Sequence, residues 1–209
     1  MITTKICLIR HGETSWNAER RLQGHTDIPL NARGVLQARQ MAQALKDIKL
    51  TFDVLYTSDL KRAADTANAI VELFGMDALV DSELRERHFG ALQGLSVSEA
   101  PLKHPDIWQA HIARNLEHDL DGGESIQQFA LRVENALEKI QARHTGKTIL
   151  VVSHGGTLDM MYRIASKQAL NTERIVSVPN ASLNWITHSK VDGWAVDQWA
   201  DTRHLDGPA

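Results

Sequence analysis

The chain has 209 residues, of which 43% are hydrophobic and 23% charged, and its formal net charge is −3. These values are ordinary for a soluble globular protein of one domain, and they mark neither a nucleic-acid binder nor a membrane binder. No apolar stretch approaches the roughly 20 residues that a membrane span needs. Cys7 is the only cysteine. An intramolecular disulfide is therefore excluded, and with no signal-peptide pattern before Lys5 a cytoplasmic location is expected.

Two strands and one helix are predicted in the first part of the chain. Lys5–Ile9 is a short apolar run, typical of a parallel strand that is covered on both faces. Asn31 can cap a helix that continues to about Leu45, with apolar residues on one face. Asp53–Tyr56 is a weaker candidate strand.

The middle of the chain is predicted to form one regular helix followed by an irregular segment. Ser58 or Asp59 can cap a helix whose apolar residues recur at helical spacing until Gly75, a residue type that commonly ends helices. Residues 94–123 show weak periodicity and contain three histidines. This segment is predicted to leave the core as a cap-like excursion that covers a site.

Two helices and a strand follow. Ser125 and Gln128 form a capping-box pattern, which predicts the start of a helix. Thr148–Ser153 is a second strongly apolar run and predicts another buried strand. A further helix is expected from Thr157 to about Ser166.

The C-terminal part has a different pattern. Leu183–Thr187 alternates between apolar and polar residues, and a turn signal at Asp192-Gly193 precedes Trp194–Trp199, which predicts a strand hairpin. No repeat or linker divides the chain. Strands that alternate with helices favour the α/β class, with residues 1–209 forming a single domain.

Two histidines follow the two most apolar strands. His11 stands in Arg10-His11-Gly12, directly after the first strand, and His154 stands in Ser153-His154-Gly155, directly after the later one. The carboxyl ends of parallel strands form the ligand crevice of open α/β sheets, so both imidazoles are expected at one site. Arg10 beside His11 suggests that the ligand is an anion, most naturally a phosphate.

Other residues could complete a phosphate site. Arg62 is near the predicted start of a helix, where backbone N–H groups favour anions, and Gly155 lets the backbone approach a ligand. Asn17 can add a neutral donor, and Gln23 with Gly24 lies in the loop after His11. A neutral histidine is an adequate nucleophile toward phosphorus, while a second, protonated histidine could stabilise the transferring oxygens.

The ordered set of motifs resembles the histidine phosphatase superfamily, in the branch that contains phosphoglycerate mutases and related small phosphatases. The motifs run along nearly the whole chain: Arg10-His11-Gly12-Glu13-Thr14, Trp16-Asn17, Leu22-Gln23-Gly24, Pro29-Leu30-Asn31, Tyr56-Thr57-Ser58, Arg62, Glu86-Arg87-His88-Phe89-Gly90, Gly122-Gly123-Glu124-Ser125 and Ser153-His154-Gly155. The resemblance implies a three-layer α/β domain with a mostly parallel central sheet flanked by helices.

The resemblance also implies roles for individual residues. His11 would be phosphorylated, Glu86 would protonate the leaving alcohol and later activate water, and His154 would be the second histidine. Arg10, Arg62 and Asn17 would hold the phosphate, and no metal or other cofactor would be needed. Glu86 has an alternative role, as a simple ion-pair partner of one of its neighbouring arginines.

Departures from the mutase pattern favour hydrolysis. By the same resemblance, mutases carry a tyrosine in place of Phe89, a lysine in place of Val97, and an arginine pair in place of Gln109 and Ala110. Without these groups the dephosphorylated product can leave, and water can discharge the phosphohistidine. The expected activity is therefore metal-independent hydrolysis of a small phosphorylated metabolite.

Two other functions remain open at this point. One is a phosphoglycerate mutase, and the other is a phosphate-binding protein without turnover. The spacing of His104, His111 and His118 is compatible with one helical face, but solvated or substrate-covering histidines are expected there rather than metal ligands. The substrate stays unidentified, and the apolar faces are compatible with a homodimer.

Overall fold

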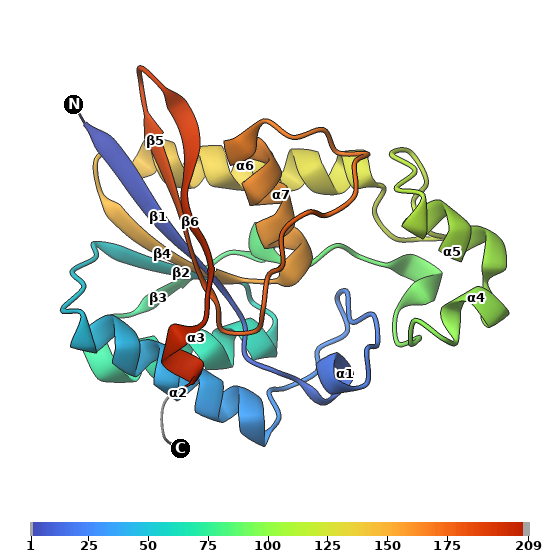
Figure 1. The fold of residues 1–209 in the computed structure, drawn as a ribbon, viewed down its shortest axis with the longest axis horizontal. Helices are drawn as coiled ribbons and strands as arrows, with labels where there is room; N and C mark the ends of the chain where they lie inside the picture. Colours follow the sequence, from blue (N-terminus) through green and yellow to red (C-terminus); the bar gives the residue numbers. More distant parts are fainter. Residues whose placement is uncertain (1, 207–209) are drawn as a thin grey trace.

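A computed structural model describes residues 2–206. Its centre is a six-stranded sheet with the order β3-β2-β4-β1-β5-β6 (Figure 1). The strands are β1 (Thr3–Arg10), β2 (Val54–Thr57), β3 (Ala78–Val80), β4 (Thr148–Ser153), β5 (Leu183–Ser189) and β6 (Gly193–Asp201). The first four strands in this order pair in parallel, and β5 and β6 add to the β1 edge in antiparallel fashion. The expected mostly parallel sheet is therefore confirmed.

Helices cover both faces of the sheet, so the fold has three layers (Figure 1). They are α1 (Ser15–Ala18), α2 (Ala32–Asp47), α3 (Lys61–Phe74), α4 (Ala100–Lys103), α5 (Pro105–Ile112), α6 (Ile126–Arg143) and α7 (Gly155–Ser166). Alternate residues of β1 face opposite layers, as strand geometry requires. Ile6 and Leu8 pack with α6 and α7, whereas Cys7 and Ile9 pack with α2 and α3.

Most predicted helix ends are confirmed, with two corrections. The Asn31 side chain accepts the Gly34 N–H, and Gly75 ends α3 in the left-handed region at φ 68°. Neither Ser58 nor Asp59 caps α3, whose N-cap is Leu60 without a side-chain hydrogen bond. Helix α7 begins at Gly155 rather than at Thr157, because the chain turns into the helix directly after His154.

Residues 94–123 lie outside the main layers and include α4 and α5 (Figure 1). Ala100 and Leu120 of this segment form a small separate apolar cluster with Leu92. Because α5 ends at Ile112, the three histidines of this segment do not share one helical face.

The sheet brings three strand ends to one place. Arg10 at the end of β1 is opposite Ser153 at the end of β4, and Thr57 of β2 is opposite Val152. The residues that follow these strands therefore start their loops side by side. None of the helices that the structure describes is long and apolar enough to cross a membrane.

Candidate active site

A cavity of about 470 Å³ lies at the carboxyl ends of the parallel strands. Seven of the nine predicted site residues line it: Arg10, His11, Asn17, Gln23, Arg62, Glu86 and Gly155. His154 and Gly24 are not among its lining residues, although both contact residues that are. The predicted site is thus assembled from segments that are far apart in the sequence.

His11 is held in one orientation at the base of this cavity. Its Nδ1 is 2.7 Å from the carbonyl oxygen of Gly12, so in the neutral ring Nδ1 carries the proton. Among residues 2–206 no group hydrogen-bonds its Nε2. Burial lowers the pKa of His11 well below its usual value, and the charges of Arg62 and Arg10 lower it further. The arrangement therefore presents a neutral imidazole with a free lone pair on Nε2.

His154, between β4 and α7, packs against His11. The ring centroids are 5.2 Å apart, and His154 is completely buried. Its Nε2 lies 2.9 Å from the Ser58 hydroxyl, while its Nδ1 has no partner among the described residues. Burial, and then the charge of Arg62, lowers the pKa of His154 well below its usual value. Without a bound anion, the surroundings of His154 therefore favour its neutral form. The protonated form had been considered from the sequence.

Two arginines flank His11, of which Arg62 is buried and Arg10 is partly buried. Arg62 on α3 donates to the carbonyl oxygens of Thr26 and Gly24, at 2.9 and 2.7 Å, and Arg10 donates to Val178 O at 2.6 Å. The Nε of each guanidinium is buried without a protein partner in the described chain. Burial lowers the pKa of both to about 10, which still leaves them charged at neutral pH. Fixed cations with unused donors form a binding site for an anion.

Glu86 reaches the cavity from the loop after β3. Its Oε2 accepts the Gly156 N–H at 2.8 Å, and its Oε1 accepts the Arg87 N–H at 2.9 Å. The alternative role as an ion-pair partner of its neighbours is not adopted. Arg85 pairs with Asp59, and the guanidinium of Arg87 donates to backbone carbonyl oxygens.

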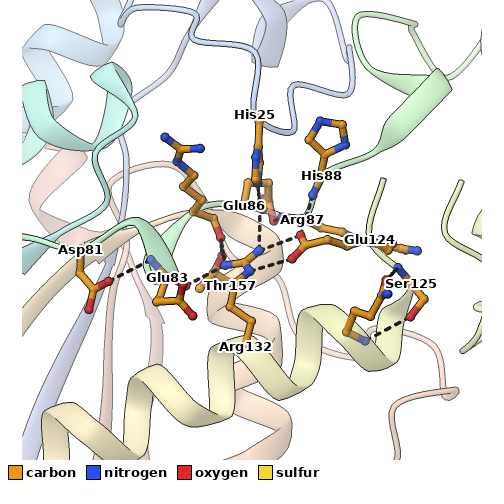
Figure 2. A network of polar contacts seen from close by, with 12 residues as sticks. His25, Asp81, Glu83, Glu86, Arg87, His88, Glu124, Ser125, Arg132 and Thr157 are labelled. Atoms are coloured by element: carbon orange, nitrogen blue, oxygen red, sulfur yellow. Dashed lines mark hydrogen bonds and ion pairs between the residues drawn. The ribbon is translucent and has the colours of Figure 1, made fainter. Parts of the chain in front are cut away.

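A network around Arg132 positions the backbone on both sides of Glu86 (Figure 2). From α6, the Arg132 guanidinium donates to the carbonyl oxygens of Glu83, Arg85 and Glu86 and pairs with both carboxylate oxygens of Glu124. The Thr157 hydroxyl donates to Arg85 O, and the His25 ring lies 2.8 Å from Glu86 O. One partly buried cation thus fixes the loop that carries the candidate acid.

The other predicted residues form the cavity wall. Asn17 accepts the Thr14 N–H and hydroxyl through its Oδ1, which leaves its amide group as the donor. Gln23 is buried, and its Oε1 has no partner among residues 2–206. Gly155 starts α7, close to the guanidinium of Arg10.

Three further polar residues of the cavity were not predicted from the sequence: Arg21, Arg114 and Arg174. His111, one of the histidines expected to be solvated or to cover the substrate, also lines the cavity. No motif contains Arg114 or Arg174. The sequence signal that could have indicated them is indirect, namely Asp159 and Arg163 on the otherwise apolar face of α7. Buried charges of this kind need partners. Ser58 and Arg132 were also missed as supporting residues.

These groups suit transfer of a phosphoryl group. A neutral ring nitrogen can attack phosphorus, two arginines can neutralise the phosphoryl oxygens, and a carboxyl group on the same cavity can give a proton to a leaving oxygen. His11, Arg62 and Glu86 come from three separate segments but line one cavity.

Comparison with known proteins agrees with this chemistry. The chain is 40% identical over 205 residues to phosphoglycerate mutase-like protein 4 of Arabidopsis thaliana, covering 97% of this chain and 87% of that protein. It is 40% identical over 206 residues to a metal-independent phosphoserine phosphatase of the same plant, covering 97% and 83%. A phosphoserine phosphatase of Entamoeba histolytica, solved with 3-phosphoglyceric acid, superposes with a TM-score of 0.85 at 27% identity, covering 97% of this chain and 99% of that one.

The family model of the histidine phosphatase superfamily (branch 1) matches residues 6–202. This match includes β2 to β6, the part of β1 from Ile6 onward, and all residues of the candidate site. The chain therefore belongs to branch 1 of the histidine phosphatase superfamily.

Proposed function

We propose that this protein is a phosphoric monoester hydrolase that works through a phosphohistidine on His11. The observation that carries the proposal is the orientation of His11, whose Nδ1 is held by Gly12 O in a cavity lined by Arg10, Arg62 and Glu86. In-line attack by Nε2 on phosphorus breaks the ester bond, and Glu86 gives its proton to the leaving alcohol. Glu86 then removes a proton from the water that releases phosphate.

The other site residues bind the transferring group. Arg10 and Arg62 neutralise the phosphoryl oxygens with their unused N–H groups, and Asn17 adds an amide donor. His154 and Gly155 close the base of the site, where a dianion beside His154 would favour its protonated form. Gln23 completes the wall, and Gly24 fixes Arg62 through its carbonyl oxygen.

Hydrolysis is favoured over mutase activity by the phosphatase-named relatives. The cavity does contain further cations, contrary to the expectation from the sequence. Gln109 and Ala110 stand where mutases are expected to carry an arginine pair, but Arg114 and Arg174 line the cavity. A cytoplasmic location agrees with Cys7 as the single cysteine, which is buried and whose thiol pKa is raised by that burial.

The test is phosphate release from a panel of small phosphate monoesters in the presence of a chelator. Turnover is expected to persist with chelator and to fall at least about 1,000-fold in His11→Ala, since the nucleophile is removed. His188→Ala, on β5 and outside the cavity, is the control. Loss of turnover on chelation, or turnover retained in His11→Ala, would contradict the proposal. Isomerisation of 3-phosphoglycerate without net phosphate release would identify a mutase instead.

A further inference from the structure

A buried carboxylate beside the cavity is surrounded by three arginines. Asp159 on α7 is 1% exposed, and its oxygens lie 3.0 Å from Arg163 Nε, 3.2 Å from Arg174 Nε and 3.9 Å from Arg114 Nη2. Three positive charges therefore meet one negative charge. Such an excess is costly in a partly buried place unless another anion joins the cluster.

Arg163 uses its donors within the protein and accounts for only one of these charges. It is 2% exposed and donates to Ala169 O, the Thr172 hydroxyl and Glu173 O, in addition to Asp159. The pair of Arg163 and Asp159 is thus neutral and fixes the loop that leads to Arg174.

Arg114 and Arg174 line the cavity, and each keeps N–H groups that no described residue accepts. Arg114 follows α5, donates from Nε to Leu170 O at 2.8 Å, and has a buried Nη2 without a hydrogen-bond partner in the described residues. Arg174 donates from Nη2 to Gly155 O at 3.1 Å. Both line the main cavity and a smaller adjoining one of about 90 Å³. Each guanidinium is oriented by Asp159 and by one backbone carbonyl.

These two arginines lie on the leaving-group side of the site. Glu86 and Gly156 line both cavities together with Arg114 and Arg174. Because Glu86 is the proposed acid, the alcohol that it protonates must leave toward this region. The leaving group is therefore the part of the substrate that meets the two arginines.

The charge balance of the cavity indicates a second anion. Its lining includes five arginines and one carboxylate, Glu86. Arg21 is already paired with Glu19 and Glu99, and a phosphoryl dianion matches Arg10 and Arg62. Glu86 carries its proton in the state in which it acts as the acid, so two positive charges remain, those of Arg114 and Arg174.

We infer that Arg114 and Arg174 bind a carboxylate on the leaving group, so that the substrates are phosphate monoesters of small carboxylic acids. This inference rests on the proposed phosphatase function. A guanidinium presents parallel N–H groups that match a carboxylate, and two arginines oriented from different segments hold it without reorganising.

The experiment compares esters that differ only in the carboxylate. The pairs are 3-phosphoglycerate with glycerol 3-phosphate, and O-phosphoserine with O-phosphoethanolamine. The protein is expected to prefer the carboxylate ester at least about tenfold in kcat/KM in one pair or both, since charged hydrogen bonds discriminate by this amount. Equal kcat/KM values within each pair would overturn the inference while leaving the phosphatase function intact.

Variants assign the preference to these residues. The preference ratio is kcat/KM for the ester with the carboxylate divided by kcat/KM for its partner without it. Arg114→Gln and Arg174→Gln are each expected to reduce this ratio roughly ten- to hundredfold. The control is Arg39→Gln, an exposed arginine of α2 outside the cavity, for which the ratio should match that of the wild type. Arg174→Lys keeps the positive charge and should retain part of the preference ratio. Such partial retention would show that the loss in Arg174→Gln is not caused by misfolding. Ratios that stay at the wild-type value in both glutamine variants would overturn the assignment.

Two further outcomes are informative. Fructose 1,6-bisphosphate could be hydrolysed faster than every carboxylate ester, with the same dependence on Arg114 and Arg174. This result would identify the second anion as a phosphate and overturn the inference of a carboxylate. Absence of hydrolysis for all esters, p-nitrophenyl phosphate included, would reject the phosphatase function itself. The two proposals can therefore fail separately.

Discussion

The carboxylate of Glu86 lies where a helix begins and where a leaving group would depart. The Gly156 N–H, in the first turn of α7, donates to its Oε2 at 2.8 Å. A Cβ atom at position 156 would overlap Glu86 Oε1. The absence of a side chain at this one position therefore allows the carboxylate to stand against the helix N-terminus, next to the cavity.

Glu86→Gln tests whether this carboxyl group is the acid. Glutamine keeps the size and can still accept the Gly156 N–H, but it cannot transfer a proton. We expect kcat/KM for alkyl phosphates to fall about 100-fold or more, and that for p-nitrophenyl phosphate to fall much less, because p-nitrophenolate leaves without a proton. Gly156→Ala should show the same selectivity at smaller amplitude. Equal losses for both ester types would remove the acid role from Glu86.

At the scale of elements, α6 positions a loop that it does not adjoin in sequence. Arg132 lies in the first half of this helix, and its guanidinium reaches the carbonyl oxygens of Glu83, Arg85 and Glu86 (Figure 2). Its charge is balanced by Glu124, just before the helix begins. The apolar face of α6 packs on the sheet, so the geometry of the core is transmitted to the candidate acid.

Arg132→Gln should therefore impair proton transfer at a distance from the substrate. We expect the same selective loss for alkyl over aryl esters as in Glu86→Gln, about tenfold. A fall of about 2–4 kcal/mol in the free energy of unfolding should accompany it, because Glu124 is left without its partner. Arg143→Gln, an exposed arginine at the end of the same helix, is the control. Kinetics on both esters and urea unfolding measure these effects, and an unselective loss would limit Arg132 to a structural role.

The helices and strands that were predicted from the sequence are those in which apolar residues form a clear pattern. The apolar strands β1 and β4, the capped helices α2 and α6, and the terminal hairpin owe their pattern to burial against the core. The edge strand β3 has only three residues, and two of them are exposed, so it carries no such pattern. Helix α5 buries no residue fully. For the same reason the periodicity of residues 94–123 was weak.

The residues of the candidate site also differ in how far the sequence could predict them. His11, His154 and Arg10 could be placed because they follow strands whose ends meet, whereas Arg62 and Glu86 needed the family resemblance. Arg114 and Arg174 could not be placed by either route. Their positions depend on Asp159, a tertiary partner that is 45 residues from one and 15 from the other along the chain. Local pattern contains no information on such pairing.

Across the whole molecule, the buried histidines make stability depend on pH. Burial lowers the pKa of His11 and His154 well below the usual value of 6.5, and that of His111 to about 4. In the unfolded chain these rings titrate near 6.5. As the pH falls below 6.5, the unfolded state therefore takes up protons that the folded state resists, and the folded state loses stability.

We expect the free energy of unfolding to be highest above pH 6.5 and to fall between pH 6.5 and 4.5, by about 1.4 kcal/mol per pH unit for each such histidine. Carboxylates with lowered pKa values contribute mainly below pH 5, so the upper part of this window reports on the histidines. Urea unfolding at half-unit pH steps measures the slope, and His111→Gln should reduce it, since one resisting group is removed. A slope that is the same in wild type and His111→Gln would contradict the contribution of that ring. Inorganic phosphate should lessen the acid loss, because an anion beside His11 and His154 favours their protonated forms.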